Sequence, residues 1–262
     1  MNEEAYFKAW KAAVKKQKSA VNPSELAMLG GKLCLNANPA FIFIAGYQAA
    51  IRATFADVDS LKWLAFAASE DRGDGERKPG VTIKNHCLYG VKTWIAASKF
   101  VQQLVLKIGK GPSAKYVKVD LPITEVSIFH KPTPTFLPEL SQGEAEFNGA
   151  SFSELQDLSR VPMFADCEPY YIYLALLSAL SNYQTSTDTS GATRQFTEKA
   201  GQLLKEHRGA MKQLAKLDQA VQHLLSSPAF EASGLLSHWG SDARLFSMYS
   251  KGIQARYGET GA

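Results

Sequence analysis

The segment most indicative of the fold is residues 88–98, which read Leu-Tyr-Gly-Val-Lys-Thr-Trp-Ile-Ala-Ala-Ser. Aromatic and β-branched residues dominate it, and this composition is typical of a strand. Similar short runs stand on both sides, separated by turn formers such as the Gly-Lys-Gly-Pro at 109–112. The predicted strands are 61–69, 81–85, 88–95, 103–108, 116–121, 126–130 and 144–147. No helical period lies between them, so the pattern favours an antiparallel barrel or sandwich.

Helical patterns flank this region on both sides. Before it, apolar residues recur at helical spacing from Tyr6 to Val14, and 41–55 is apolar on most sides. After it, the expected elements are an apolar helix opened by Pro169, a loop at 184–193, one long amphipathic helix at 196–225 and a final helix at 240–257. We therefore predict an α+β multidomain chain. It would have a short N-terminal helical domain (1–58), an antiparallel β domain (59–149) and a C-terminal helical bundle (150–262).

The composition is that of an ordinary soluble globular chain. Of the 262 residues, 45% are hydrophobic and 21% are charged, with a net charge of +4. This charge is too small to indicate a nucleic-acid partner, and no apolar run is long enough to predict a membrane span. The 3 cysteines and 5 histidines show no metal-ligand spacing, so we expect no metal site. Widely separated cysteines also favour the cytoplasm as the compartment.

Four segments together resemble the acyl-CoA dehydrogenase family. Residues 63–70 (Trp-Leu-Ala-Phe-Ala-Ala-Ser-Glu) resemble the strand that ends in Thr-Glu-Pro, and residues 88–98 resemble the Gly-x-Lys-x-Trp/Phe-Ile-Thr/Ser hairpin. Residues 139–147 are similar to the segment that closes the β domain, and 242–246 to the Arg-Asp-Ala-Arg start of the last helix. The likeness is clearest over 61–149. It implies an FAD-dependent oxidoreductase that acts on the CH–CH group of an acyl-CoA-like thioester.

The resemblance also implies where FAD would bind. In that family the cofactor lies between the β domain and the C-terminal helices and reaches a neighbouring subunit, which implies a homodimer or a larger oligomer. Trp94 would pack near the flavin ring. Ala96 stands where the family carries a threonine or serine, and Ser98 offers a hydroxyl close by. Arg244 and Gln254, matched to the family's final helix, would lie in the cofactor region.

The reaction also needs a carboxylate that removes the α-proton of the substrate. Many members carry it in a Tyr-Glu-Gly-Thr stretch, but the corresponding run here is Tyr249-Ser250-Lys251-Gly252. Some members place the base elsewhere in the C-terminal helices, and Glu168, beside Asp166, is the candidate here. The alternative interpretation of Glu168 is a carboxylate that stabilises the start of a helix. The sequence leaves the catalytic residue unassigned.

Two other functions remain open at this stage. A catalytically inactive relative would bind an acyl-CoA-like ligand or pair with a second, catalytic dehydrogenase subunit. The missing glutamate and the short N-terminal segment suggest it. A module for nucleic acid or acidic ligands would use the lysines within 8–18 and the basic residues within 205–216. The dehydrogenase hypothesis would place the protein in fatty acid metabolism.

Overall fold

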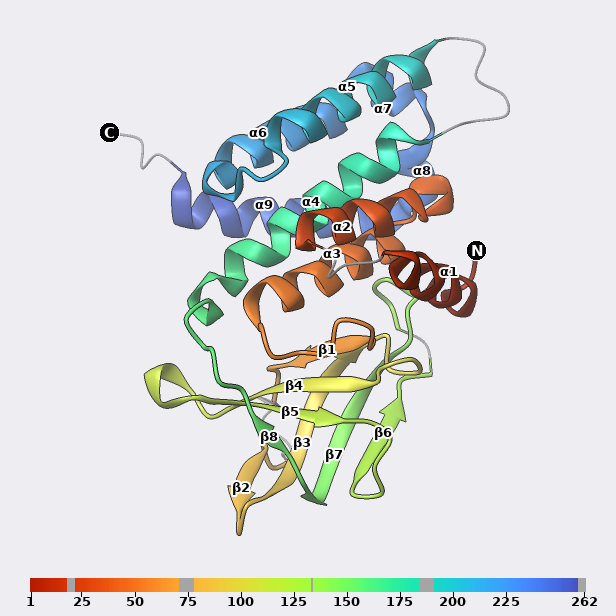
Figure 1. Ribbon diagram of the computed structural model, residues 1–262. Helices are drawn as coiled ribbons and strands as arrows, with labels where there is room; N and C mark the ends of the chain where they lie inside the picture. The colour runs from red at the N-terminus through yellow and green to blue at the C-terminus, as the bar shows by residue number, and fades with distance from the viewer. Residues whose placement is uncertain (18–21, 71–77, 133, 184–190, 259–262) are drawn as a thin grey trace. The chain divides into compact units, whose positions relative to one another are not determined.

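The computed structural model describes residues 1–17, 22–70, 78–132, 134–183 and 191–258. The chain forms two compact units (Figure 1). Residues 51–161 make up a β unit, and residues 1–50 join residues 162–262 in a helical unit. The predicted division into 1–58, 59–149 and 150–262 follows chain order and stays a prediction.

The β unit contains two four-stranded sheets. The first has the order β1 (Leu64–Ala67), β4 (Gln103–Ile108), β5 (Lys115–Asp120), β8 (Ser153–Glu154). The second has the order β2 (Thr82–Lys84), β3 (Cys87–Ala96), β7 (Gln142–Ala150), β6 (Val126–His130). The strand pairs are antiparallel except for β1 and β4, which run parallel. The predicted sandwich is therefore confirmed, whereas the barrel is not closed.

The parallel pair has a topological cause. Between β1 and β4 the chain leaves the first sheet to form β2 and β3 of the second, and then returns. Strands joined by such a crossover can lie parallel, whereas a tight hairpin forces the antiparallel arrangement. All the predicted strands are present, and β8 was missed because two residues carry no readable period.

Both sheets contribute to one apolar core. Leu88 and Phe147 of the second sheet and Leu104 and Val117 of the first belong to the same buried cluster. In β5 the burial alternates along the strand, with Val117 and Val119 inside and Lys118 between them partly exposed. This two-residue period is expected of a strand that faces an apolar core on one side.

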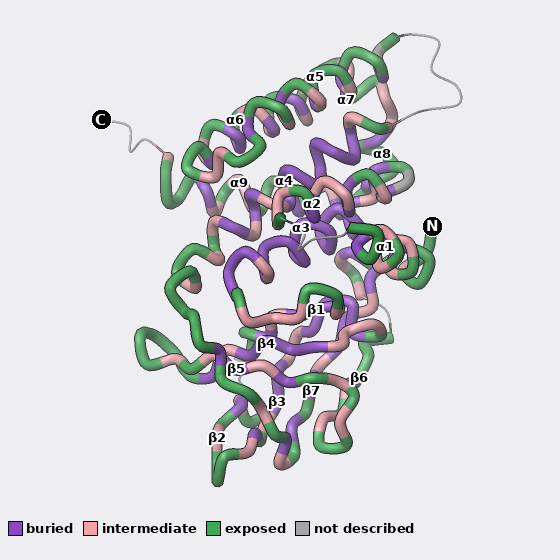
Figure 2. Tube along the Cα trace, in the orientation of Figure 1, coloured by how far each residue is buried: buried purple, intermediate pink, exposed green. Residues whose placement is uncertain are grey.

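The helical unit contains helices from both ends of the chain. They are α1 (Glu3–Lys16), α2 (Pro23–Lys32), η1 (Leu35–Ala37), α3 (Pro39–Thr54), η3 (Val161–Met163), α4 (Phe164–Ser181), α5 (Ala192–His207), η4 (Met211–Gln213), α6 (Leu214–Leu225), α7 (Pro228–Ala232), α8 (Leu235–Trp239), η5 (Gly240–Ala243) and α9 (Arg244–Tyr257). Asn2 and Asn22 cap the starts of α1 and α2 through their side-chain oxygens. Helix α4 is buried along most of its length, as Figure 2 shows, and is the central helix of the unit.

Helix α3 packs directly against the backbone of α4. A Cβ atom at Gly46 would lie 2.4 Å from the Cα atom of Ile172, a separation that no side chain tolerates. The glycine therefore permits the close approach of the two helices. Tyr47, which follows Gly46, is buried in the same unit.

Three of the sequence predictions concern the C-terminal helices and the loop between them. The single helix predicted at 196–225 is wrong, because α5 ends at His207 and α6 begins at Leu214. Gly209 has a φ of 82° at the break, which ends helical geometry. Pro169 does not open the apolar helix but lies inside α4, which begins at Phe164. Most of the predicted loop at 184–193 lies outside the described residues.

Candidate active site

Trp94 lies near the C-terminal end of β3, and its ring is partly buried. Its Nε1 donates a hydrogen bond to Oε1 of Gln142 at 3.2 Å. The Gln142 amide is held in turn, because its Nε2 donates to the carbonyl oxygen of Phe136 at 2.5 Å. The hydrogen bond therefore fixes the orientation of the Trp94 ring, and the indole N–H has its partner inside the β unit.

Ser98 and Ala96 lie just beyond this indole along the chain. The Ala96 side chain is buried and has no polar atom. Ser98 is 4% exposed, and its Oγ lies 2.9 Å from Nδ1 of His130. A hydroxyl carries one donor and two acceptor positions, so a contact with His130 leaves capacity for a second partner. Trp94, Ala96 and Ser98 lie at the end of β3 and just beyond it, and their contact with a flavin stays a prediction.

The two motif segments of the β unit are joined by a buried ion pair. Nζ of Lys92 lies 2.6 Å from Oε1 of Glu70 and also donates to the carbonyl oxygen of Lys107. The Lys92 side chain is 1% exposed, and burial lowers the pKa of its amine while Glu70 raises it. The pair therefore connects the segment at 63–70 with the segment at 88–98. These are the same two segments that carry the sequence resemblance.

Among the described carboxyl groups of the helical unit, Glu168 has the largest shift in pKa. It lies beyond the first turn of α4 and is partly buried. Burial raises the pKa of Glu168 to about 7, while a hydrogen bond from the Tyr249 hydroxyl acts in the opposite direction. A carboxylate whose pKa is near neutrality can accept and release a proton at physiological pH. Its place in the helix does not match the alternative of a carboxylate in the first turn.

The hydroxyl that contacts Glu168 stays protonated. Burial and the neighbouring Glu168 carboxylate raise the pKa of Tyr249 well above its ordinary value, and Tyr47 and Tyr173 add to the shift. Three tyrosines from α3, α4 and α9 are therefore close enough to interact electrostatically. The group beside Glu168 is therefore a neutral hydroxyl and not a second base.

Gln254 and Arg244 both lie on α9 but have different surroundings. Nε2 of Gln254 donates to Oδ2 of Asp218 at 2.7 Å, so this side chain is engaged inside the helical unit. Arg244 is the first residue of the helix and is exposed. Gln254 shares α9 with Tyr249, the residue that influences Glu168 of α4. The predicted contacts of Arg244 and Gln254 with a cofactor stay predictions.

The start of α4 is fastened to the end of α9. Pro169 has no N–H, so the carbonyl oxygen of Ala165 lacks the usual helical donor, and Arg256 Nη2 donates to it at 2.9 Å instead. Arg256 Nε lies 3.1 Å from Oδ1 of Asp166, and the Tyr257 hydroxyl donates to Oδ2 of the same carboxylate. The proline inside α4 is therefore accommodated by a specific tertiary contact.

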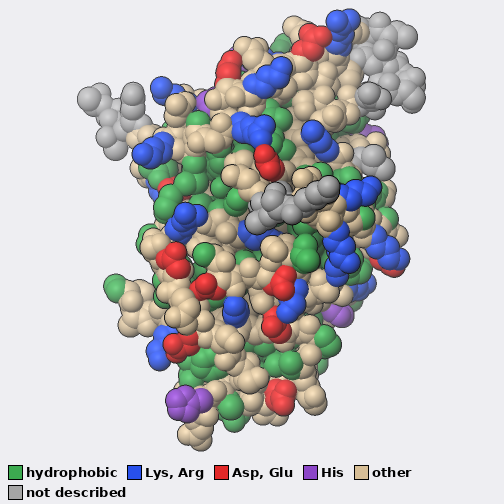
Figure 3. All heavy atoms as spheres, viewed as in Figure 1, with side chains coloured by type: hydrophobic (Ala, Val, Ile, Leu, Met, Phe, Trp, Pro, Cys, Tyr) green, Lys and Arg blue, Asp and Glu red, His purple; other side chains and the backbone are tan. Residues whose placement is uncertain are grey.

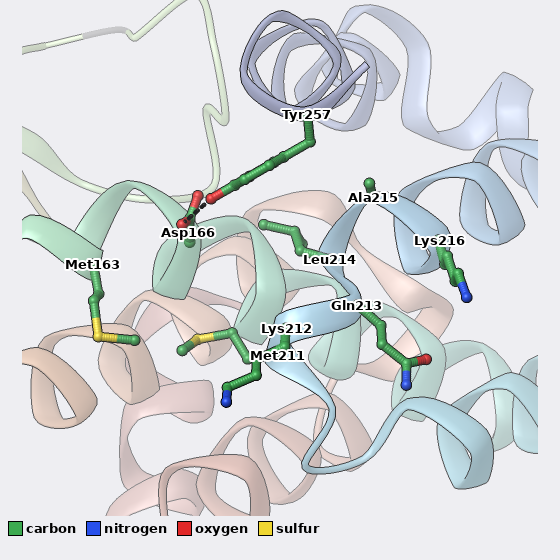
Figure 4. Close-up of a pocket in the computed structure, with 9 residues that line it drawn as sticks. All are labelled: Met163, Asp166, Met211, Lys212, Gln213, Leu214, Ala215, Lys216 and Tyr257. Carbon is green, nitrogen blue, oxygen red and sulfur yellow. Dashed lines mark hydrogen bonds between the residues drawn. The ribbon is translucent and has the colours of Figure 1, made fainter. Parts of the chain in front are cut away.

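A cavity of about 530 Å³ opens beside this contact. Figure 4 shows Tyr257 extending from α9 toward Asp166 on α4, with η4 and the start of α6 on the other side. Its walls are mostly apolar and two lysines belong to its lining: Met163, Asp166, Met211, Lys212, Gln213, Leu214, Ala215, Lys216 and Tyr257. The cavity thus combines apolar side chains with groups of both charges, since Asp166 lines it together with the two lysines.

The basic residues singled out in the sequence do not form a uniform positive surface. Lys8 pairs with Glu4 at 2.5 Å, and Arg208 pairs with Glu25 at 3.1 Å. On the face drawn in Figure 3, acidic side chains lie among the lysines and arginines. Within the described residues, no group of three His, Cys, Asp or Glu side chains could hold a metal ion. No helix in the described part has the length and apolar character needed to cross a bilayer.

The sequence analysis did not identify Tyr47, Asp218 or the interaction of Tyr249 with Glu168. Asp218 carried a signal, because it falls on the apolar stripe formed by Leu214 and Val221 of the same helix. A carboxylate in such a stripe is expected to be buried and to need partners. Those partners could not be named before the fold was known, because they lie on distant segments.

Several solved structures are similar to this chain over nearly its whole length. The prolyl acyl carrier protein oxidase AnaB has 11% identity and a TM-score of 0.61, with 100% of this chain and 88% of that chain covered. PigA, solved with FAD and proline, has 13% identity and a TM-score of 0.61, covering 97% of this chain and 88% of that one. Butyryl-CoA dehydrogenase from Megasphaera elsdenii has 10% identity and a TM-score of 0.54, covering 97% and 90% respectively.

No family model and no curated protein sequence matches the chain. The structural likeness therefore shows the fold, which is that of the acyl-CoA dehydrogenases, as the sequence motifs predicted. The segments that carried the sequence resemblance lie in the β unit, and the altered carboxylate lies in the helical unit.

Proposed function

We propose that this chain, which has the fold of the acyl-CoA dehydrogenases, is an FAD-dependent oxidoreductase acting on the CH–CH group of an acyl thioester. The observation that carries the proposal is Glu168. It is a partly buried carboxylate whose pKa burial raises to about 7, and the nearby Tyr249 hydroxyl lowers that pKa. Such a group fits the base that the reaction requires, and it supplies the carboxylate that position 250, a serine, lacks.

The residues of the β unit fit the demands of a flavin. Trp94 offers an apolar ring whose orientation is fixed by Gln142, and Ser98 offers a hydroxyl held by His130. A flavin site needs a flat apolar wall and a few fixed polar groups. PigA, a structural neighbour, was solved with FAD, which supports the choice of cofactor. Trp94 and Ser98 would hold FAD here, and the bound cofactor would supply the acceptor for the hydride that leaves the β-carbon of the substrate.

Glu168 performs the proton half of this reaction. It accepts the proton from the α-carbon, and the electron pair left by that C–H bond forms the new double bond. The Tyr249 hydroxyl donates to the ionised form of Glu168 and so favours the state that can accept a proton. Burial has the opposite effect, and the balance keeps the pKa close to physiological pH.

We further propose that the cavity beside α4 receives part of the thioester's carrier. Met163, Met211 and Leu214 would contact its apolar portion, while Lys212 and Lys216 would attract a phosphate. A phosphopantetheine arm has this chemistry, and it is common to CoA and to acyl carrier proteins. One structural neighbour is described as an acyl carrier protein oxidase, which keeps both carriers within the proposal.

Absorption spectroscopy tests the proposal directly. We expect the purified protein, supplied with FAD, to retain the flavin absorption bands after desalting. Trp94→Ala is expected to weaken FAD binding by about tenfold or more through loss of the ring contact, whereas Phe129→Ala, an exposed aromatic of the same unit, is the matched control. Failure to bind FAD would refute the proposal.

The second step of the test separates activity from binding. A panel of acyl-CoA and acyl-carrier-protein thioesters is mixed with the flavin-loaded protein, and bleaching of the flavin reports reduction. Glu168→Gln should bind FAD normally and lose bleaching by about 10²-fold or more. Flavin binding with no bleaching by any thioester would favour the inactive relative. In that case a co-purifying dehydrogenase subunit is expected.

We also propose an oligomeric state, a cellular location and a metabolic role. A homodimer or larger assembly follows from the family resemblance, and mass measurement in solution checks it. A cytoplasmic location agrees with the three free cysteines, Cys34, Cys87 and Cys167. A role in fatty acid metabolism requires that a fatty acyl thioester is the substrate, which the bleaching panel determines.

A further inference from the structure

Asp218 is a fully buried carboxylate that the proposed function does not use. It lies on α6 with 0% exposure. Its Oδ1 accepts hydrogen bonds from the Tyr173 hydroxyl at 2.7 Å and from Gln222 Nε2 at 3.5 Å. Its Oδ2 accepts from Ser250 Oγ at 2.9 Å and from Gln254 Nε2 at 2.7 Å. In the part of the chain that the structure describes, Asp218 forms no ion pair.

These contacts join three helices at one carboxylate. Tyr173 belongs to α4, whereas Ser250 and Gln254 lie one turn apart on α9. Burying a carboxylate without a cation is costly, and hydrogen bonds from neutral donors offset only part of that cost. An apolar residue at position 218 would pack without this cost. It could not hold the facing sides of α4 and α9 in a fixed register.

The same two helices carry the candidate base and its donor. Tyr249 directly precedes Ser250 on α9, and Glu168 lies on α4 with Tyr173. The Tyr249 hydroxyl is near enough to Glu168 to lower the pKa of its carboxyl, and Tyr173 is near enough to influence Tyr249. A shift of α9 that broke the Ser250 and Gln254 contacts would therefore also move the Tyr249 hydroxyl away from Glu168.

We infer that Asp218 is a positioning residue for the Glu168–Tyr249 pair, which it serves by fixing α9 through Ser250 and Gln254. Its meaning for the reaction rests on the proposed role of Glu168 as the base. Asp218 itself acts through the helix and does not touch the substrate. Among the residues that the structure describes, Tyr47 of α3 and Tyr173 of α4 are the titratable groups that influence Tyr249 beside Glu168, and Asp218 of α6 accepts from Tyr173.

A thermodynamic cycle on the full-length chain tests this inference without flavin or substrate. The protein is labelled with ¹³C at the glutamate side-chain carboxyl, and the Glu168 signal is assigned by its loss in Glu168→Gln. Tyr249→Phe should raise the pKa of Glu168 by about half a unit or more, because the ionised form loses a hydrogen bond. Asp218→Asn should raise it as well, and it should produce no further rise in the Tyr249→Phe background.

A matched control and a second pair of variants complete the design. Glu25→Gln, an exposed member of a surface ion pair in the same unit, should leave the pKa of Glu168 unchanged. If circular dichroism shows that Asp218→Asn does not fold, Ser250→Ala and Gln254→Leu take its place. Each of them should also raise the pKa of Glu168. An unchanged or lowered pKa in the folded variants, or an equal rise in both backgrounds, would overturn the inference.

The two proposals fail in different ways. A protein that binds no FAD but shows the coupled pKa shifts would refute the proposed function and leave Asp218 as the positioning residue of a structural pair. A protein that reduces flavin with a thioester but shows no coupling would keep the function and remove the role assigned to Asp218.

Discussion

At the scale of single residues, Glu168 has the clearest physical consequence. Its ordinary pKa of 4.5 is raised to about 7 in the folded protein, mainly by burial. The unfolded chain therefore loses this proton at a lower pH than the folded chain does. Ionisation of Glu168 consequently makes folding less favourable as pH rises through this interval.

We predict that replacing Glu168 changes how stability depends on pH. Because this pKa is raised on folding, the unfolding free energy of the wild type falls by about 3 kcal/mol as the pH rises. Most of this decrease occurs between about pH 5 and about pH 8. Glu168→Gln lacks this titration, so its stability relative to wild type should increase over that range. Urea unfolding at both pH values measures the difference.

An exposed glutamate on α5 provides the control for this measurement. Glu206→Gln should show the same pH dependence as the wild type, because its carboxylate is exposed. Parallel pH profiles for wild type and Glu168→Gln would contradict the buried, proton-holding environment assigned to Glu168.

At the scale of elements, the break between α5 and α6 depends on Gly209. Its φ of 82° lies in the left-handed region, and a Cβ atom there would meet no other atom within 4 Å. Gly209→Ala should therefore cost only backbone strain, about 1 kcal/mol of unfolding free energy. Thermal or urea unfolding measures this loss.

The matched substitution lies within α5. A Cβ atom at Gly201 would make an ordinary contact with Ser181 at 3.7 Å, so Gly201→Ala should stabilise the protein by about 0.5–1 kcal/mol. Equal effects of the two alanines would show that residues 208–210 do not hold the backbone conformation described above.

The Lys92–Glu70 pair fastens two elements of the β unit together. Because the Lys92 side chain is 1% exposed, Glu70→Ala leaves a buried ammonium without its partner. We expect a loss of about 3 kcal/mol of unfolding free energy. Adding Lys92→Met should cost less than the sum of the two single changes, since it removes the unpaired charge. Urea unfolding of all four proteins gives the coupling.

Lys78 and Glu144 form the control pair in the same unit. The Lys78 side chain is 54% exposed, so Lys78→Ala should cost less than about 1 kcal/mol. A similar cost for the two pairs would mean that burial of Lys92 does not decide the strength of its ion pair.

At the scale of the whole molecule, the two units are built differently along the chain. The β unit is one continuous segment, residues 51–161, and its sandwich core is formed from within that segment. The helical unit combines 1–50 with 162–262, and α4 packs against α2 and α3 from the first of these segments.

We therefore predict different behaviour for two fragments. A fragment of residues 51–161 should fold into the sandwich and unfold cooperatively in urea. A fragment of residues 162–262 should not fold cooperatively, because α4 would expose the surface that α2 and α3 cover. Circular dichroism and urea titration of each fragment provide the measurement, and the reverse outcome would contradict this division.

The amino-acid sequence was sufficient to predict the order of helices, strands and helices. Runs of β-branched and aromatic residues between turn formers located β4 and β6 at their observed bounds, Asn22-Pro23 marked a helix start, and the motifs at 63–70 and 88–98 identified the fold. These features depend on residues that are neighbours in the chain, so their physical cause is local.

Only the tertiary structure decided which of these residues form a site. Burial in the helical unit raises the pKa of Glu168 and Tyr249 lowers it, the charge of Asp218 is satisfied by Tyr173 and Gln254, and Pro169 is accommodated by Arg256. Each of these contacts joins segments that are distant in sequence. Burial and hydrogen bonding are properties of the folded environment, and no pattern confined to one segment specifies them.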